Sequence, residues 1–276
     1  MRAITAQTAV LGIFGDPVGH SLSPVMHNGW IADHDLDAVY VAFPLKSEDP
    51  VGAFRALKGM KLKGANITVP HKEAAAEAAD ISEGAVANVW RWEADGTVAA
   101  FNTDGVGFVD ALTEAAPDWR ARVGETLILG SGGAAHGVAQ ALAGQTHLAI
   151  ANRTFQRAEK LATALPRAHA ESWHDLERLF AGADLIVQTT TLGMSGTASP
   201  HWPVERCKPG AIVVDIVYRP LHTPLLKAAK AQGLTAVDGL GMLIHQGARA
   251  FKLWFDIEPD TKLARRRLLA ALGEHE

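Results

Sequence analysis

The stretch Leu127-Ile-Leu-Gly130-Ser-Gly132-Gly133-Ala-Ala135 decides the fold of this 276-residue chain. It follows the pattern G-x-G-x-x-G/A at the point where an aliphatic strand is followed by an alanine-rich helix. In this pattern Gly130 permits the tight turn, Gly132 lets the backbone approach a pyrophosphate, and small Ala135 lets the helix pack on the strand. The phosphates then lie over the helix N-terminus. The stretch predicts a dinucleotide-binding βαβ unit; a glycine-rich turn without a ligand is the alternative.

The residues after the next expected strand, 148–151, indicate which dinucleotide is bound. In an NAD site an acidic residue about 20 positions after the glycines hydrogen-bonds the adenine ribose. Here the run is Asn152-Arg153-Thr154-Phe155-Gln156-Arg157, with two guanidinium groups and no carboxylate. Because arginine binds phosphate in a forked geometry, the run favours a 2'-phosphate and therefore NADP. The alternative is that Thr154 caps a helix and both arginines are solvated.

The rest of the chain predicts an α/β protein of two modest domains. Short β-branched runs alternate with amphipathic stretches, and the second half is close to a complete doubly wound, Rossmann-type domain. A cleft between the domains is the expected ligand site. The expected strands are 10–14, 39–43, 64–68, 87–92, 98–101, 126–130, 148–151, 185–188, 212–215 and 235–237, with a hairpin turn at Asp95-Gly96. Helices are expected from Pro24 and over 51–57, 70–79, 104–115, 134–143, 155–165, 173–180, 224–232 and, as the final helix, 240–254.

Composition narrows the class of protein. With 48% hydrophobic and 20% charged residues the chain is too apolar for disorder, and its net charge of -4 argues against a nucleic-acid partner. The single cysteine, Cys207, cannot form a disulfide within the chain, which fits a reducing compartment. No apolar stretch approaches the ~20 residues that span a bilayer, and no secretory signal is visible. We expect a cytoplasmic protein with no membrane partner and, since the histidines show no zinc-binding spacing, no metal.

Polar side chains stand at three strand-to-helix junctions of the first half. Ser21 and Ser23 precede Pro24, where hydroxyls and free N–H groups favour an anion such as a carboxylate; capping by Ser23 is the alternative. Lys72 stands in an expected first helical turn, and Asp104 stands at the next junction. Taken singly, Lys72 is typical of a surface lysine and Asp104 of an N-cap. Paired in a partly desolvated site, they are suited to proton transfer during hydride transfer.

Together the motifs resemble the shikimate dehydrogenase family, and the resemblance runs nearly end to end. The matching segments are Gly15-Asp-Pro-Val-Gly-His-Ser-Leu-Ser-Pro-Val-Met-His-Asn28, Asn66-Ile-Thr-Val-Pro-His-Lys72, Asn102-Thr-Asp-Gly105, Gly130 to Ala135, Asn152-Arg-Thr154, Val214-Asp-Ile-Val-Tyr218-Arg-Pro, Thr223-Pro-Leu-Leu226 and Gly239-Leu-Gly-Met-Leu-Ile-His-Gln246. The resemblance implies the reversible, NADPH-dependent reduction of 3-dehydroshikimate to shikimate in aromatic amino-acid biosynthesis. It implies a substrate domain of residues 1–104 completed by 238–276, and an NADP domain of 105–237. Monomer and homodimer both stay open.

The resemblance also implies a role for each matching residue. Lys72 and Asp104 are the catalytic pair, and Ser21 and Ser23 hold the substrate carboxylate. Thr68, Asn88, Asp104, Tyr218 and Gln246 address the ring hydroxyls or their surroundings. The dinucleotide contacts are Gly130, Ser131, Gly132, Gly133, Ala134, Asn152, Arg153, Thr154 and Arg157, with Ile216, Gly239 and Met242 near the nicotinamide end.

One segment departs from the family pattern, and two other functions stay open. Where the family usually has Gly-Ala-Val-Asn-Thr, this chain has Gly84-Ala-Val-Ala-Asn88-Val89. We assign Asn88 as the equivalent asparagine, with Val89 in place of a hydroxyl. The alternatives are a quinate/shikimate dehydrogenase of broader specificity and a noncatalytic NADP-binding sensor. Ser21 and Ser23 favour shikimate, and a sensor is expected to lack Lys72 or Asp104.

Overall fold

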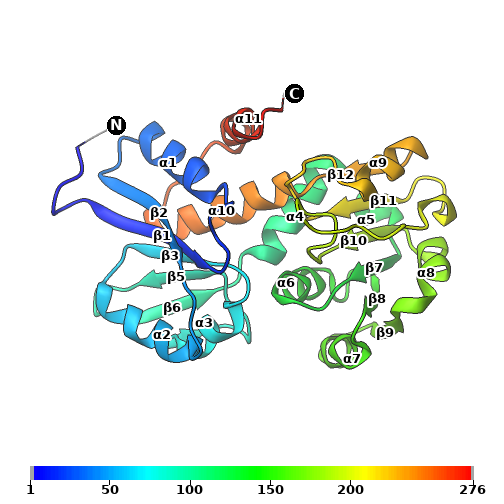
Figure 1. The fold of residues 1–276 in the computed structure, drawn as a ribbon, viewed down its shortest axis with the longest axis horizontal. Helices are drawn as coiled ribbons and strands as arrows, with labels where there is room; N and C mark the ends of the chain where they lie inside the picture. The colour runs from blue at the N-terminus through cyan, green and yellow to red at the C-terminus, as the bar shows by residue number, and fades with distance from the viewer. Residues whose placement is uncertain (1–2, 275–276) are drawn as a thin grey trace. The chain divides into compact units, whose positions relative to one another are not determined.

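The computed structural model describes residues 3–274 and divides the chain into two compact units. Unit 1 consists of Met1–Asp104 and Ile244–Glu276, and unit 2 is Gly105–Leu243. Each unit contains its own six-stranded sheet (Figure 1). The second boundary lies at residue 244, inside a long helix, rather than at the expected residue 238.

Unit 1 has a mixed sheet with the strand order β2-β1-β3-β5-β6-β4. The elements are β1 (Ala9–Gly15), α1 (Ser23–Asp33), β2 (Ala38–Pro44), α2 (Pro50–Leu57), β3 (Gly64–Ile67), α3 (Lys72–Ala78), β4 (Ile81–Ser82), β5 (Val89–Trp92), β6 (Val98–Phe101), part of α10 (Gly239–Phe255), and α11 (Thr261–Leu272). β1 is parallel to β2 and β3, whereas β5 is antiparallel to β3 and β6. The hairpin at Asp95-Gly96 is confirmed, with Gly96 at a φ of +90°.

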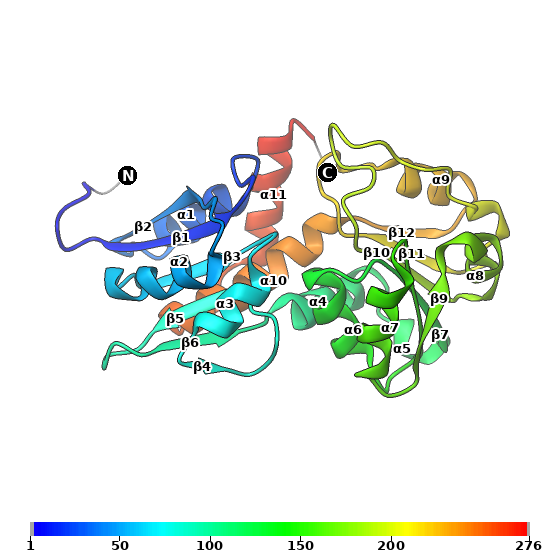
Figure 2. The same cartoon turned by 60° about the horizontal axis from the view of Figure 1, so that its bottom comes forward.

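The two faces of this sheet are covered by different helices. Along β3, Ala65 and Ile67 point into an apolar cluster that α2 and α3 complete, and both views show these helices on one face of the sheet (Figures 1 and 2). Gly64 faces the other way, against Trp254 of α10. Because side chains alternate along a strand, Asn66 shares the face of Gly64. This face also carries Tyr40, whose hydroxyl donates to Asn66 Oδ1 at 2.6 Å.

Unit 2 has a fully parallel sheet with the order β12-β11-β10-β7-β8-β9. Its elements are α4 (Asp104–Ala115), α5 (Trp119–Arg122), β7 (Glu125–Leu129), α6 (Gly133–Leu142), β8 (His147–Asn152), α7 (Phe155–Thr163), β9 (Ala168–Ser172), α8 (Leu176–Gly182), β10 (Leu185–Gln188), β11 (Ile212–Asp215), α9 (Pro224–Ala231) and β12 (Thr235–Val237). The chain runs outward from β7 on one side and from β10 on the other. This is the doubly wound Rossmann order, and it confirms the expected fold class.

Helices cover both faces of the unit 2 sheet, as the doubly wound order requires. Ile128 of β7 belongs to an apolar cluster with α4, α6 and α7, and Leu127 and Leu129 belong to a second cluster with α8 and α9. β7 and β10 are neighbours, and the strand order reverses between them. Ligands of such sheets bind beyond the carboxyl ends of the strands at this point.

Several elements differ from the expectations. The sequence did not predict β4, α5, β9 or α11, so 240–254 is not the final helix. The expected helix 173–180 begins with a 3-10 turn, Trp173–Asp175, before α8 starts at Leu176.

Within residues 3–274 we find no helix with the length and hydropathy needed to cross a bilayer.

Candidate functional site

Lys72 and Asp104 form an ion pair in unit 1. Lys72 is the first residue of α3, and its ammonium donates to Asp104 Oδ2. Both side chains are largely shielded, with exposed fractions of 11% and 6%. A cation at a helix N-terminus opposes the helix dipole, so a nearby carboxylate is needed to hold it there. The structure excludes the surface-lysine alternative for Lys72, because only a small part of its side chain is exposed.

Asn88 binds the second oxygen of the same carboxylate. Its Nδ2 lies 2.9 Å from Asp104 Oδ1, 3.0 Å from the Thr103 hydroxyl and 3.1 Å from Gln246 Oε1. Asn88 Oδ1 accepts from the Thr103 backbone N–H at 2.7 Å. The Asp104 carboxylate is therefore fixed on one side by an ammonium and on the other by an amide. It does not cap α4, which begins at Asp104 itself, so the N-cap alternative for Asp104 is wrong.

A second layer of polar groups lies behind this pair. Asn66 Nδ2 donates to the Asn88 carbonyl at 3.3 Å, and Tyr40 donates to Asn66 Oδ1. The Thr103 hydroxyl donates to the Gln246 carbonyl at 3.1 Å, which ties α10 to the junction before α4. Asn66, Asn88 and Thr103 are all buried. Buried polar groups that are satisfied in this way hold one geometry, so the network orients the Lys72–Asp104 pair.

The serine segment and Thr68 follow neighbouring strands of unit 1. β1 and β3 are parallel partners, so the segment after Gly15 and the segment after Ile67 start at the same sheet edge. A Cβ at Gly15 would lie 2.3 Å from Thr68 Cγ2, so only glycine permits this approach. Ser23 is buried, and Ser21 is partly buried.

Ser23 does not cap α1, contrary to the capping alternative. The helix begins at Ser23, Leu22 takes the N-cap position, and no side chain caps the helix. Instead the Ser21 hydroxyl accepts from the Ser23 backbone N–H at 3.2 Å. Capping therefore does not explain why two serines stand here.

The glycine-rich turn of unit 2 has the geometry that a dinucleotide needs. Gly130 has a φ of +115°, and a Cβ there would lie 2.6 Å from Thr189 Oγ1. Gly132 is the N-cap of α6, and a Cβ on it would meet no atom within 4 Å, so its backbone is open to a ligand. Ala135 is fully buried against the sheet. The Ser131 hydroxyl is buried without a hydrogen-bond partner in the described residues, so a polar group of a ligand would satisfy it.

The run 152–157 follows β8, the strand next to β7. Asn152 Nδ2 donates to the Thr154 carbonyl at 2.9 Å, which fixes the turn into α7. Thr154 is the N-cap of α7 but its side chain makes no capping hydrogen bond. Arg153 and Arg157 are both exposed. Their guanidinium groups are therefore accessible to a phosphate at the carboxyl edge of the sheet.

Comparison with known proteins finds family matches in both units. Residues 13–89 match the family "Shikimate dehydrogenase substrate binding domain", 115–217 match "Shikimate / quinate 5-dehydrogenase" and 239–269 match "Shikimate 5'-dehydrogenase C-terminal domain". The shikimate dehydrogenase (NADP(+)) of Rhodospirillum rubrum is 43% identical, covering 98% of this chain and 99% of that protein. The chain belongs to the shikimate dehydrogenase family.

Solved structures with this fold include members of the family that differ in their ligands. The Thermus thermophilus shikimate 5-dehydrogenase in complex with NADP(H) and shikimate has a TM-score of 0.80 and 34% identity, over 94% of this chain and 99% of that one. The Corynebacterium glutamicum quinate dehydrogenase in complex with NAD has a TM-score of 0.86 and 30% identity, over 95% and 99%. The fold is therefore shared by enzymes named for either substrate.

The structure places the remaining residues expected from the family as follows. Gln246 lies in unit 1, and Tyr218 lies in unit 2, partly buried. Ile216 and Gly239 are in contact, because a Cβ on Gly239 would lie 2.2 Å from the Ile216 carbonyl oxygen. Met242 is buried in a core cluster of unit 2. Val89, where the family usually has threonine, is fully buried in β5 and pairs with Asn66 and Phe101 across the sheet.

Sequence reasoning missed several polar residues that complete the site. Thr103 and Asn66 belong to quoted motifs but received no role, although each bonds to Asn88. Tyr40 lies outside every motif and was not considered. For Asn66 and Tyr40, burial of a polar residue in a strand would have been the signal, but a single sequence does not show which face of a strand is buried.

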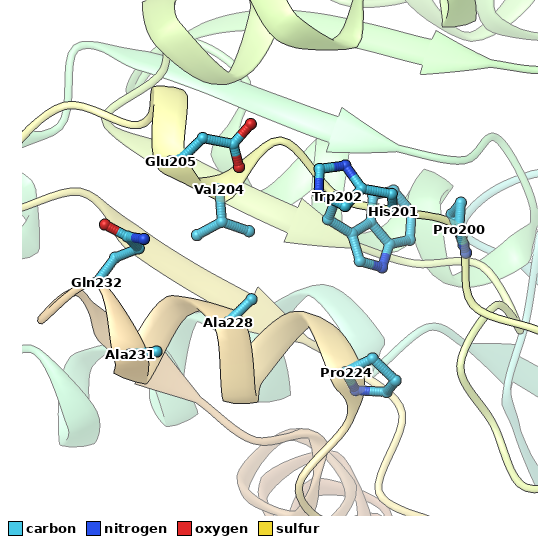
Figure 3. A pocket seen from close by; sticks show the side chains of 9 residues that line it. All are labelled: Pro200, His201, Trp202, Val204, Glu205, Pro224, Ala228, Ala231 and Gln232. Carbon is cyan, nitrogen blue, oxygen red and sulfur yellow. The ribbon is translucent and has the colours of Figure 1, made fainter.

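Unit 2 also contains a pocket of about 340 Å³ that none of the expected site residues lines (Figure 3). Trp202 and Val204 form one wall, and Pro224 and Ala228 of α9 form the other. Among residues 3–274, no cluster of three or more His, Cys, Asp or Glu is arranged to hold a metal ion.

Proposed function

We propose that this protein catalyses the reversible, NADPH-dependent reduction of 3-dehydroshikimate to shikimate, a step of aromatic amino-acid biosynthesis. The observation that carries the proposal is the shielded Lys72–Asp104 ion pair, held by Asn88 in a chain of this family. NADP is the cofactor, and when bound as NADPH it supplies the hydride. The glycine turn and the exposed Arg153 and Arg157 in unit 2 are the groups that hold it.

Lys72 supplies the proton in this reaction. As the hydride reaches the carbonyl carbon of the substrate, the carbonyl oxygen becomes basic and takes a proton from the Lys72 ammonium, forming the hydroxyl O–H bond. Lys72 is left as a neutral amine and regains a proton from solvent. Asp104 stays ionised and aligns the Lys72 Nζ, and in shikimate oxidation the same steps run backwards. Asn88 prevents the Asp104 carboxylate from rotating away.

The other substrate contacts follow from the same arrangement. Ser21 and Ser23 bind the carboxylate through their hydroxyls and the N–H groups at the start of α1, where the helix dipole favours an anion. Thr68, Asn88, Tyr218 and Gln246 address the ring hydroxyls or their surroundings. Because the residues with chemical roles are all present, an NADP sensor without catalysis is not supported.

The proposal is tested by substitutions of Lys72. General acid–base catalysis typically contributes ~10²- to 10⁴-fold, so Lys72→Ala should lower kcat by at least about 100-fold while KM for shikimate changes only several-fold. Lys72→Arg keeps the positive charge but does not release a proton near neutral pH, so it should stay as slow as Lys72→Ala. A small primary amine added to Lys72→Ala should restore part of the rate.

The matched control is Lys58→Ala, which removes another Lys–Asp pair of unit 1, the pair with Asp80. Its kcat should equal that of the wild type. NADP affinity, measured by titration calorimetry, should be unchanged in all three variants. A Lys72→Ala protein with normal kcat would show that another group moves the proton.

A further inference from the structure

Asp215 is a buried carboxylate whose partners are all uncharged. It ends β11, an interior strand of the unit 2 sheet between β12 and β10, and has an exposed fraction of 1%. Oδ1 accepts from the Val217 backbone N–H at 3.0 Å and from Gln188 Nε2 at 3.2 Å. Oδ2 accepts from the Thr223 hydroxyl at 2.7 Å. A buried charge that is not neutralised by a cation is costly, so its retention calls for an explanation.

Gln188 forms hydrogen bonds to the loop that follows β10. It ends β10, pairs with Asp215 in the sheet register, and is fully buried. Its Nε2 also donates to the carbonyls of Thr190 and Leu192, each at 3.1 Å, and its Oε1 accepts from the Thr190 backbone N–H. The Asp215–Gln188 contact therefore joins the loops that leave two adjacent strands at the carboxyl edge of the sheet. That edge is where ligands of doubly wound sheets bind.

The segment 216–222 is tied at both ends to the single carboxylate of Asp215. Val217 is held at its start, and Thr223, which also caps α9, is held at its end. The Ile216 backbone N–H donates to the Gln188 carbonyl at 3.1 Å, and Gly239 packs against the Ile216 backbone. The segment carries Ile216, which the family resemblance places near the nicotinamide end, and Tyr218, to which the proposed function gives a substrate contact.

We propose that Asp215 is a positioning residue for the dehydrogenase reaction, fixing the segment 216–222 so that Ile216 and Tyr218 keep their places. The inference rests on the proposed function for the roles of these two residues. The pKa of Asp215 is raised to about 6, because the effect of burial outweighs the opposing effect of the hydrogen bonds from Thr223, Val217 and Gln188. The carboxylate is therefore ionised at neutral pH, and its hydrogen bonds are charge-assisted and stronger than those of a neutral amide.

Three substitutions test this role. Asp215→Asn keeps the shape of the side chain, but its amide NH2 group then faces a group that donates a hydrogen bond to Asp215 in the wild type. Thr223→Val leaves Asp215 Oδ2 without its hydroxyl partner. Both should lower kcat/KM for shikimate by about 10-fold or more, because a shift of the segment 216–222 misplaces the groups that orient the reactants. Thr223→Ser keeps the hydroxyl and should stay within about 3-fold of the wild type.

The matched control is Thr126→Val at the opposite end of the same sheet. Thr126 is buried and its hydroxyl lies 3.0 Å from that of Thr146, so the variant also loses a buried hydroxyl contact. Its melting temperature should fall, but its kcat/KM measured well below that temperature should not. If Asp215→Asn and Thr223→Val behave like Thr126→Val, Asp215 has only a structural role and the inference is wrong.

Hydrogen exchange tests the inference without any turnover. Amides of 216–222 should exchange at least about 10-fold faster in Asp215→Asn and Thr223→Val than in the wild type and in Thr126→Val. Unchanged exchange would overturn the inference even in an active enzyme. A wild type that does not oxidise shikimate would instead refute the proposed function. If amide exchange in Asp215→Asn and Thr223→Val then also equals that of this wild type, the inference is refuted as well.

Discussion

At the scale of single residues, the site depends on groups that would be unfavourable alone. Lys72 stands at a helix N-terminus and Asp104 is buried, and each is stabilised by the other. The sequence suggested this pair because both residues follow expected strands. It did not reveal the hydrogen bonds of Asn88. Those bonds depend on the pairing of β5 with β3 and β6, which joins segments that are separated along the chain.

Arg153 should determine the choice between NADP and NAD. A hydrogen bond to a charged group contributes ~1.5–3 kcal/mol, so Arg153→Ala should weaken NADP binding by roughly 10- to 150-fold. NAD has no 2'-phosphate, so its affinity should hardly change. Titration calorimetry with both cofactors measures this, and Arg178→Ala, on an exposed face of α8, is the control. Equal losses for NADP and NAD would refute the 2'-phosphate contact.

His27 should make the stability of the protein depend on pH. It is fully buried and stacks on Tyr40 at a centroid distance of 4.4 Å. Burial lowers the pKa of His27 from 6.5 to about 3, and the Asn66 side chain only partly opposes this. Below about pH 6.5 His27 is protonated in the unfolded chain but stays neutral in the folded protein. The free energy of unfolding therefore has its full value above that pH and falls as the pH drops toward 3.

The size of this effect is up to about 1.4 kcal/mol for each pH unit in that window. Urea unfolding of the wild type and of His27→Leu at several pH values measures it. The wild type should lose stability relative to the variant as the pH falls from 6.5 toward 4. Two curves that stay parallel would mean that His27 is not buried in its neutral form.

At the scale of elements, strands with aliphatic runs and helices with clear starts were predictable. β10, β11, β12, β6 and α4 lie at the expected residues. β9 was missed because Ala168-His-Ala-Glu-Ser has no β-branched residue and lies at the sheet edge with partly exposed side chains. α11 was missed although Asp260 caps Leu263 and Gly273 ends the helix with a φ of +75°. Those two signals were present in the sequence.

The close approach of α4 and α6 should depend on Gly105. A Cβ at this position would lie 2.4 Å from the Gly137 carbonyl oxygen and 2.9 Å from Ala141 Cβ. Gly105→Ala should therefore lower the free energy of unfolding by about 1–3 kcal/mol, the usual effect of overpacking. The control is Gly182→Ala at the end of α8, where a Cβ meets nothing within 4 Å. Equal unfolding free energies for the two variants would show that the helices move apart freely.

At the scale of the whole molecule, the residues with proposed roles are distributed over two units with different sheets. The mixed sheet of unit 1 carries the Lys72–Asp104 pair, and the parallel sheet of unit 2 carries the glycine turn and the arginines. The sequence predicts a second domain boundary at residue 238, whereas the compact units change six residues later, at residue 244. α10 passes through the boundary without interruption, so no turn marks it in the sequence.

The most direct test measures turnover by the purified wild-type protein. Shikimate and quinate are each supplied with NADP and with NAD, and formation of the reduced nicotinamide is followed by absorbance. The account predicts that shikimate with NADP has the highest kcat/KM, at least about 10-fold above each other combination, because serine at both 21 and 23 is the pattern that favours shikimate in the family resemblance and Arg153 is proposed to bind the 2'-phosphate. No turnover of shikimate with NADP, or faster turnover of quinate with NAD, would contradict it.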